Sequence, residues 1–521
     1  MSSAYVCMCP MCAGPLAGSK PTDLPPAPAA AVVATSITGD YRVDCLLENA
    51  QLRWNATAAM GTSVEVTYSF MTAKPTYGGT DSGGDVGFRA YTTQQMEAVR
   101  GIFTRLATET GLRFREVADS ATSYGQIRFG NNTQTVSAGY AYMPNSTGDD
   151  LSGDVWTDDS DPTNLTNVGA GTYAYSTLVH EIGHALGLKH PGNYNAGEAS
   201  RATTAGNFLG AAEDSTVYTI MSYRDNSNGV QRDWFGSYDL LALRALYGAG
   251  TGNSGDTRFS FDSTAATRLA TIYDSGGTDT LDVSASGAAS TVDMRPGGFS
   301  TVGGTTANNV SIDLSTTVEN FVGSASNDTV TGNTANNRFT LGAGTNRADG
   351  GAGTDVAVYG SARAGYQVAN SNGTLTVSGN GATDTLSNIE RLEFSDRRLA
   401  FDVKSQQVAK VLGAVFGPST IPQFEGIGLQ LMDGGMSYET LMGAALQFRL
   451  GANATNEAVV GLLLQNLLGF EMPAAVIANF TPFITSGQYT QATFGILAAD
   501  HPLNTNNINL VGIIANGVSY T

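Results

Sequence analysis

The spacing of apolar side chains between residues 41 and 250 indicates a mixture of strands and helices. In Val64–Phe70 every second residue is apolar, which predicts a half-buried strand. Apolar residues then recur three or four positions apart between 96 and 106, after Thr92 and Thr93 as capping residues, which predicts a helix. Further strands are expected at 114–117, 126–129, 138–143 and 154–157, and further helices at 175–186 and 239–246. The region therefore predicts an α+β domain.

Residues 251–403 lose this pattern and become rich in Gly, Asn, Asp, Thr and Ser between short β-prone runs. Four nonapeptides follow one another there without a gap from Gly323 to Val358: GSASNDTVT, GNTANNRFT, LGAGTNRAD and GGAGTDVAV. Their period matches the calcium-binding nonapeptide G-G-x-G-x-D-x-U-x, in which U is a large apolar residue. The repeats predict an all-β, calcium-binding parallel β-roll or sandwich.

The sixth position of each nonapeptide is the expected calcium ligand, and here it is Asp328, Asn337, Asn346 or Asp355. In a β-roll, a calcium ion lies between one turn and the turn two repeats later, which pairs Asp328 with Asn346 and Asn337 with Asp355. Each pair has one carboxylate where a regular repeat offers two, and fewer charged ligands bind calcium more weakly. We expect at most two structural calcium ions in these repeats; the alternative is a roll that persists without metal.

Helical periodicity returns in residues 404–521, most clearly at 406–416, 436–448, 458–468 and 491–498. We predict a small all-α domain there and assign it no chemistry. Residues 1–40 form a leader, in which Cys7, Cys9 and Cys12 precede a linker rich in Pro and Ala. The predicted domains are therefore 1–40, 41–250, 251–403 and 404–521.

Composition excludes several classes of function. The 521 residues include 27 basic and 46 acidic side chains, for a net charge of −19, which repels nucleic acid and anionic lipid and favours calcium. Four cysteines in a chain of this length cannot form a disulfide scaffold. We find no apolar run long enough to span a membrane and no basic segment before an apolar one that would predict a secretory signal peptide.

The strongest chemical signal is a histidine cluster. Three of the four histidines lie in one short window, HEIGHALGLKH, as His180, His184 and His190. The first two are four residues apart, so one helical face presents both imidazoles to a common point. Gly187 allows the chain to leave the helix sharply, and His190 can then return as a third ligand. Three imidazoles with an open fourth position predict a catalytic zinc site.

Glu181 follows the first of these ligands and is predicted to act as the general base. Zinc lowers the pKa of its bound water toward ~7, Glu181 takes the proton, and the hydroxide attacks a carbonyl that the metal polarises. Glu181 then passes the proton to the leaving amine. The alternative is three unrelated histidines on a core helix. A second element, TIMSY, argues against it: Met221 is expected as an apolar floor beneath the imidazoles, and Tyr223 as a zinc ligand or a donor to the oxyanion.

These residues resemble the serralysins, calcium-dependent metzincin proteases that bacteria secrete. The resemblance rests on HEIGHALGLKHPGNYNAGE, then YTIMSY, YDLLALRALYG and IYDSGGTDTLDVSASG, and covers roughly residues 60 to 400. It implies a metzincin zinc endopeptidase domain with His180, His184 and His190 as ligands, Glu181 as base and Tyr223 as a switchable ligand and transition-state donor. Peptide substrates of such proteases lie extended along an edge strand above the zinc, and Gly153–Thr157 is our candidate for that strand.

The resemblance also implies calcium sites ahead of the nonapeptides. In DSGGTD, the expected ligands are Asp274, Asp279 and the carbonyls of Gly276 and Gly277. The family pairs this loop with an Arg-x-Gly-x-Thr segment, which here carries Asn253, Gly255 and Thr257. The arginine is therefore absent, and since the family uses its carbonyl, the loss is tolerable. Thr317 and Glu319 resemble a further family site. The alternative for each of these segments is an ordinary polar loop.

The sequence predicts an extracellular or cell-surface zinc metalloendopeptidase, monomeric and exported without a cleavable N-terminal signal by a type I secretion apparatus. Its cofactors are one catalytic Zn²⁺ and several structural Ca²⁺, and its substrates are proteins or peptides, not nucleic acid. Two alternatives stay open: an adhesive or surface-layer protein with vestigial activity, and a protease that processes one surface-layer partner. We also hypothesise that a thiolate of Cys7, Cys9 or Cys12 takes the fourth zinc position and keeps the enzyme latent; otherwise these cysteines have no role at the zinc.

Overall fold

The computed structural model describes residues 6–8, 36–75, 86–134, 137–145, 150–192, 194, 207–224, 230–232, 234–304, 306–379 and 381–520. The chain divides into two compact units, Met1–Val318 and Glu319–Thr521. Both are larger than the predicted domains, and the division into four domains stays a prediction. Cys9 and Cys12 lie outside the described residues, whereas Cys7 lies in a described strand.

A seven-stranded mixed sheet forms the frame of the first unit, in the order β1-β6-β7-β5-β2-β4, with β3 paired to β5. Strands β2, β4, β5 and β7 pair in parallel, whereas β6 is antiparallel to β7, and β1 to β6. The strands are β1 (Val6–Met8), β2 (Val64–Phe70), β3 (Val86–Arg89), β4 (Leu112–Glu116), β5 (Ile127–Thr133), β6 (Gly139–Tyr142) and β7 (Asp154–Asp158). The predicted strands at 64–70 and at four later positions are therefore confirmed.

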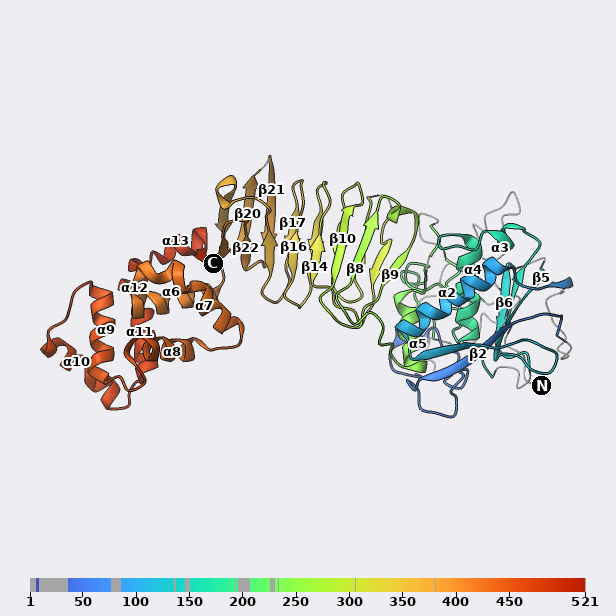
Figure 1. The fold of residues 1–521 in the computed structure, drawn as a ribbon, viewed down its shortest axis with the longest axis horizontal. Helices are drawn as coiled ribbons and strands as arrows, with labels where there is room; N and C mark the ends of the chain where they lie inside the picture. Colours follow the sequence, from blue (N-terminus) through green and yellow to red (C-terminus); the bar gives the residue numbers. More distant parts are fainter. Residues whose placement is uncertain are drawn as a thin grey trace. The chain divides into compact units, whose positions relative to one another are not determined.

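Two long helices pack on one face of this sheet (Figure 1). Helix α2 (Thr93–Glu109) begins at Thr92, whose side chain accepts a hydrogen bond from the Gln95 N–H in a capping box, as the sequence predicted. Helix α4 (Tyr173–Ala185) carries the histidine motif, and α5 (Ser237–Tyr247) ends at Gly248. Two single turns, α1 (Tyr41–Asp44) and α3 (Thr163–Thr166), complete the described helices of this unit.

The core between sheet and helices consists of alternate strand residues and one face of each helix. Val66, Phe129 and Val155 point from three neighbouring strands into this cluster, where they meet Phe103 of α2 and Ile182 of α4. All five are at most 2% exposed. Because the side chains of a strand alternate between faces, this packing fixes the register of the sheet relative to α4.

The rest of the first unit contains short strands: β8 (Arg258–Asp262), β9 (Ala270–Ile272), β10 (Thr280–Ala285), β11 (Thr291–Asp293), β12 (Phe299–Ser300) and β13 (Val310–Ile312), with the 3₁₀ turn η2 (Ala265–Thr267). Strand β10 pairs in parallel with β8, and β13 with β9. The region is β-rich, as predicted from its composition.

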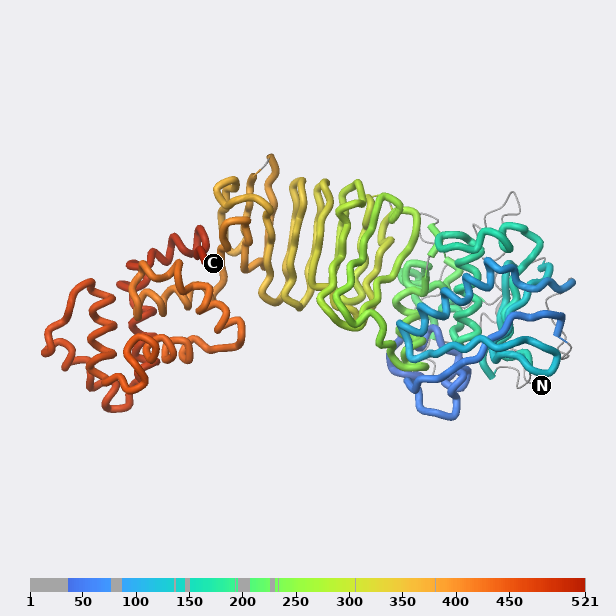
Figure 2. The backbone as a smooth tube through the Cα atoms, in the orientation of Figure 1, coloured from blue at the N-terminus to red at the C-terminus, as the bar shows by residue number. Residues whose placement is uncertain are grey.

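The nonapeptides form β15 (Thr329–Thr331), β16 (Arg338–Thr340), β17 (Arg347–Asp349) and β18 (Val356–Val358), after β14 (Asn320–Val322). Each strand pairs in parallel with the strand eighteen residues later, β14 with β16, β16 with β18 and β15 with β17. The backbone accordingly winds in successive flattened turns (Figure 2). Val330, Phe339, Ala348 and Ala357 are each at most 4% exposed, so the eighth positions face inward as predicted.

The parallel ladders continue beyond the last predicted nonapeptide. Strand β18 pairs with β22 and β17 with β21, both in parallel. The later strands are β19 (Gln367–Ser371), β20 (Thr374–Gly379), β21 (Ala382–Ser387), β22 (Arg391–Glu393), β23 (Arg398–Ala400) and β24 (Val518–Tyr520), with η3 (Arg363–Gly365). A β19–β20 hairpin is inserted in this series, and β24 pairs with β23.

The last region is helical, as predicted. Its helices are α6 (Val403–Phe416), α7 (Ile421–Asp433), α8 (Tyr438–Leu450), α9 (Asn456–Leu468), α10 (Ala474–Thr485), α11 (Gln491–Ala499), α12 (Pro502–Asn507) and α13 (Leu510–Asn516), with η4 (Pro418–Thr420). The prediction located α6, α8, α9 and α11 and missed the other four. In the part of the chain that the structure describes, no helix is long and apolar enough to cross a membrane.

A buried carboxyl in this region predicts how stability depends on pH. Burial raises the pKa of Glu425 on α7 to about 9, although the Arg391 charge lowers it. Because the folded pKa exceeds the usual value of 4.5, the stabilisation is complete in acid and is lost as pH rises toward 9. We expect Glu425→Gln to abolish this loss in thermal melts between pH 5 and pH 9, while the exposed Glu439→Gln leaves it unchanged. An equal slope in all three proteins would contradict the assignment.

Candidate metal centre

Helix α4 places the first two histidines of the motif. The Thr172 side chain caps the helix by accepting a hydrogen bond from the Tyr175 N–H, and His180 and His184 follow one turn apart on a buried face. The helix ends at Ala185, and Gly187 then adopts a φ of +101°. A Cβ at position 187 would lie 2.2 Å from the Leu52 carbonyl oxygen, so both conformation and space require glycine here. This sharp exit returns His190 to the other two, as predicted.

The three imidazoles converge on one point. The Nε2 atom of His180 lies 3.1 Å from that of His184 and 3.2 Å from that of His190, and the Nε2 atoms of His184 and His190 are 3.2 Å apart. Four tetrahedral ligands at the usual zinc–nitrogen distance would be about 3.3 Å from one another. Among the described residues, these three form the one group of histidine, cysteine or carboxylate side chains arranged to hold a metal ion.

Hydrogen bonds on the outer side of two rings fix their tautomers. The Nδ1 of His180 lies 2.8 Å from the Ile220 carbonyl oxygen, and the Nδ1 of His184 lies 2.6 Å from the Leu188 carbonyl oxygen. A carbonyl only accepts, so each Nδ1 carries the proton and each Nε2 presents a lone pair. Burial lowers the pKa of His184 well below its ordinary value, which keeps this ring neutral. Lone pairs 3.1 Å apart repel each other, and a cation between them removes that repulsion.

Met221 forms the floor beneath the ligands that the sequence predicted. It is fully buried, and a Cβ on Gly183 would come within 2.7 Å of its Sδ atom. Gly183 lies on α4 immediately before His184, so the close approach of Met221 needs a glycine at this position. The sulfur therefore packs directly against the helix segment that carries both ligands.

Asp239 supports this turn from α5 and was not singled out in the sequence. Its carboxylate accepts hydrogen bonds from the Thr219 hydroxyl, from the Ile220 N–H at 2.7 Å and from the Gly236 N–H at 2.7 Å. The Ile220 peptide thereby connects Asp239 to His180. In the sequence, Asp239 lies three positions after Gly236 at the start of a helix. This pattern indicates a helix cap and gives no hint of a role near the metal.

Tyr223 lies beside the imidazoles, as predicted. Its ring centroid is 4.1 Å from that of His190 and 6.1 Å from that of His180. Tyr194 stacks on Tyr223 at 4.9 Å and was also missed by the sequence analysis. The Tyr194 hydroxyl donates to Asp214 and accepts from the Tyr223 N–H at 3.3 Å, so it orients the Tyr223 turn. No sequence pattern separates such a tyrosine from an ordinary one.

Glu181 points from α4 toward the sheet and meets its β6 strand. The side chain is fully buried, and a Cβ on Gly139 would lie 2.9 Å from its Cγ and 3.1 Å from its Oε1. Gly139 is the first residue of β6. The proposed base therefore lies against the start of this strand, where glycine leaves room for the carboxylate.

The predicted substrate strand at Gly153–Thr157 is wrong. This segment becomes β7, which pairs with β5 on one side and with β6 on the other. A strand with two neighbours has no free backbone N–H or C=O groups for a peptide. The strand next to Glu181 is β6, whose second neighbour is β1. The short β-prone run at residues 153–157 predicts a strand but not its place in the sheet.

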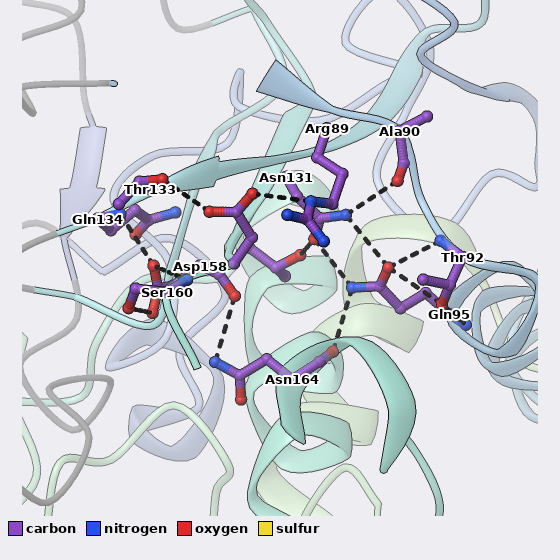
Figure 3. A network of polar contacts seen from close by, with 12 residues as sticks. Arg89, Ala90, Thr92, Gln95, Asn131, Thr133, Gln134, Asp158, Ser160 and Asn164 are labelled. Carbon is purple, nitrogen blue, oxygen red and sulfur yellow. Dashed lines mark hydrogen bonds and ion pairs between the residues drawn. The ribbon is translucent and has the colours of Figure 1, made fainter. Parts of the chain in front are cut away.

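A buried polar network fixes the sheet beside this centre (Figure 3). The Asn131 Oδ1 accepts hydrogen bonds from Gln95 Nε2 at 2.9 Å and from Thr157 Oγ1 at 2.6 Å, which joins α2, β5 and β7. Asp158 accepts from the Gln134 N–H at 2.9 Å, and its carbonyl accepts from Asn164 of α3. These contacts satisfy polar groups at the ends of β5 and β7 and hold β7 as an internal strand.

The two segments predicted as the first calcium site lie side by side. The Ser275 N–H donates to the Asn253 carbonyl at 3.0 Å, and Asp279 accepts from the Thr257 N–H at 2.9 Å. Gly277 approaches the backbone of Gly255 so closely that a Cβ would lie 2.5 Å from the Gly255 carbonyl carbon. One oxygen of the buried Asp274 accepts from Gly276, and its Oδ2 receives no hydrogen bond from the described residues. This oxygen is available to a cation.

The sixth positions of the nonapeptides pair as predicted. The Asp328 N–H donates to Asn346 Oδ1 at 2.9 Å, and the Asn337 N–H donates to Asp355 Oδ1 at 2.6 Å. The other oxygen of Asp355 is buried and receives no hydrogen bond from the described residues. Burial raises the pKa of Asp355 to about 7, and the negative charges of Glu390 and Asp349 add to the rise.

Two acidic residues of the same ladder were missed. Asp384 accepts from the Asn346 N–H at 2.9 Å, and Glu390 accepts from the Asp355 N–H at 2.8 Å. The segment GNGATDTLS, from Gly379 to Ser387, fits the nonapeptide with Asp384 in the sixth position. This further repeat could therefore have been recognised in the sequence. Thr317 is exposed in the loop before β14, and the carbonyl of Glu319 accepts from Asn337 Nδ2 at 3.1 Å.

The site and the fold define a class: a three-histidine centre of the catalytic zinc type beside a mixed sheet, with a buried methionine against its helix and a β-rich region later in the chain. Comparison with known families agrees. The family model described as Matrixin matches residues 86–197, and the one described as Peptidase M10 serralysin C terminal matches residues 242–410. In these two segments the chain is similar to the serralysin-type metzincins, a family of zinc metalloendopeptidases.

The relatives reported below are named serralysin or metallopeptidase. The chain is 34% identical to Serralysin of Proteus mirabilis, in a match that covers 53% of this chain and 61% of the relative. It is 32% identical to Serralysin C of Dickeya chrysanthemi, covering 53% and 60%, and 34% identical to Metallopeptidase AprA of Pseudomonas marginalis, covering 51% and 60%. The chain thus spans about three fifths of the length of these relatives.

Asp239 predicts a measurable effect on metal affinity. In Asp239→Ala, the Ile220 and Gly236 N–H groups lose the carboxylate oxygen that accepts from both, so the backbone whose Ile220 carbonyl meets His180 is no longer fixed. Outer partners of a zinc ligand typically contribute about 10- to 100-fold in affinity, and we expect a loss of that size in competition with a chelating dye. The exposed Asp262→Ala serves as control. Unchanged affinity in a correctly folded Asp239→Ala protein would contradict this support role.

Proposed function

We propose that the chain is a secreted, calcium-dependent zinc metalloendopeptidase in which Glu181 is the general base. The observation that carries the proposal is the convergence of three imidazole Nε2 atoms beside a buried glutamate and the start of β6. A zinc ion held by His180, His184 and His190 supplies a Lewis acid that polarises a substrate carbonyl and acidifies water. Its proposed substrates are proteins and peptides.

The residues around the centre have separate tasks in this proposal. The Glu181 carboxylate accepts a proton from the attacking water and returns it to the leaving amine. The β6 backbone aligns an extended substrate by strand addition, which places a peptide bond beside Glu181. The hydroxyl of Tyr223, whose ring lies beside His190, donates to the developing oxyanion or returns to the metal at rest.

We further propose that residues 251–403 form a calcium-binding parallel β-roll. Parallel pairing at intervals of two nonapeptides supports it, as do the buried oxygens of Asp274 and Asp355 that receive no hydrogen bond from the described residues. Sites with few carboxylates bind calcium too weakly for cytosolic concentrations and fill outside the cell. This supports an extracellular or cell-surface location; export by a type I apparatus and a monomeric state are part of the same proposal.

A narrower alternative is the processing of one surface-layer partner. It is favoured by apolar side chains exposed on the helical region, where Phe448 and Val511 are each 80% exposed. Such side chains suit recognition of a protein partner. Casein hydrolysis that a zinc chelator abolishes would support the general protease, whereas failure to cleave casein together with cleavage of one surface protein would support the alternative.

Substitution of the base tests the mechanism. Glu181→Gln keeps the three ligands, so we expect zinc to bind in full while kcat/KM on a peptide falls by about 10²- to 10⁴-fold. Tyr223→Phe keeps both the metal and the base and should lose less. Bound zinc is measured by atomic absorption beside each rate. A Glu181→Gln protein with full zinc and undiminished cleavage would refute the mechanism.

Calcium binding is predicted to depend on pH through Asp355. Without metal its pKa is about 7, so calcium must displace a proton below that pH, and affinity should fall about fivefold between pH 7 and pH 6. Asp355→Asn should bind calcium more weakly and lose the dependence of this affinity on pH.

The measurement is calcium titration followed by hydrogen exchange of residues 319–393. Equal protection with and without millimolar calcium would show that the repeats bind none.

A further inference from the structure

The helical region contains the same three-helix arrangement twice, first as α6, α7 and α8 and then as α9, α10 and α11 (Figure 1). In each set, the second and third helices pack on the first. Gly417 caps the end of α6, and the Ser437 side chain caps the start of α8. Gly469 and Thr490 do the same for α9 and α11. These caps identify equivalent positions in the two sets.

The two sets differ where their helices meet. In the first set, the ring centroid of Phe416 lies 5.8 Å from that of Phe424 and 6.1 Å from that of Phe448. Counted from the capping residues, Leu468 takes the place of Phe416, and His501 takes that of Phe448. The second set contains a cavity of about 530 Å³, and both of these residues line it. Where the first set brings its own rings together, the second set therefore leaves space.

The wall of this cavity is apolar. It is lined by four leucines of α9, from Leu463 to Leu468, by phenylalanines of α10 and by Leu497 of α11, and no Asp, Glu, Lys or Arg of the described residues lines it. Leu497 is 51% exposed, so the cavity opens to solvent. The only charged side chains of α9, α10, α11 and their connections are Glu457 and Glu471. Such a cavity is typical of sites for small apolar molecules, whereas a protein interface surrounds its apolar centre with polar side chains.

One polar group lies at the mouth of the cavity. His501 is exposed, and its Nδ1 accepts a hydrogen bond from the Leu503 N–H at 3.2 Å. A ring nitrogen that accepts carries no proton, so the neutral imidazole has its N–H at Nε2. The adjacent Asp500 is directed toward α6 and α8, where its carboxylate accepts from Lys410 at 2.9 Å and from Tyr438 at 3.2 Å. The donor at Nε2 therefore suits a carboxylate head group.

The shape of the wall favours a straight chain. The leucines of α9 follow the helix axis from 463 to 468, a rise of about 7.5 Å. An aliphatic chain can lie along such a row of leucines while its polar end stays at the mouth. We propose that this cavity binds the alkyl chain of a free fatty acid, with the carboxylate at His501. This site lies in the second unit, and the inference does not depend on the protease function.

Calorimetric titration with octanoate, decanoate and dodecanoate tests the site in the full zinc- and calcium-loaded chain, freed of unbound metal. Each buried CH₂ contributes about fourfold in affinity, so Kd should fall by about that factor for every carbon added, at one ligand per chain. Leu497→Glu places a charge in the apolar wall and should weaken dodecanoate binding about tenfold or more. Leu431→Glu on α7 is the matched control, because Leu431 is 40% exposed and does not line the cavity.

A second variant fills the cavity without adding charge. Leu468→Phe/His501→Phe reproduces the rings of the first set and should also weaken dodecanoate binding about tenfold, because the chain and the rings need the same space. Circular dichroism checks that each variant is folded; if Leu497→Glu is not, this double variant decides. Three results would overturn the inference: no binding of dodecanoate, no gain in affinity with chain length, or equal affinity in the cavity variants and Leu431→Glu. Binding of phosphatidylcholine vesicles without binding of dodecanoate would also overturn it and would assign the cavity to a membrane surface.

Discussion

Repulsion between converging imidazole lone pairs is the constraint on which this structure depends. Two of the rings are locked with Nδ1–H toward the carbonyls of Ile220 and Leu188, so their Nε2 lone pairs face each other at 3.1 Å. Such an arrangement is unfavourable without a cation and favourable around one. Three residues help to hold the imidazoles in this arrangement, because each fixes an element that carries a histidine or its hydrogen-bond partner. They are Gly187, Met221 and Asp239.

The same need for fixed geometry explains the surroundings of the centre. Helix α4 is held against the sheet by Ile182 in the main core, and the Asn131 network keeps β7 between β5 and β6. This leaves β6 as the strand that meets Glu181. The metal centre and the contact of Glu181 with β6 are therefore two consequences of one packing arrangement.

The convergence of the three histidines could be predicted from the sequence because it depends on local spacing. His180, His184 and Gly187 lie within one helix and its end, where spacing alone determines which side chains meet. The place of residues 153–157 in the sheet was predicted wrongly because it depends on pairing with β5 and β6, about which a short β-prone run carries no information. The repeat ending at Ser387 was missed because the β19–β20 hairpin interrupts the period, although Asp384 keeps its position. Asp239 and Tyr194 act through contacts distant in sequence, which no spacing rule predicts.

X-ray absorption at the zinc edge tests the central claim most directly, because it reports the ligands of the metal without any substrate. The zinc-loaded full chain is predicted to bind one zinc ion through three imidazole nitrogens at about 2.0 Å, and His190→Ala should remove one of them. A spectrum with fewer than three imidazoles in the unmodified chain, or one that His190→Ala leaves unchanged, would contradict the account.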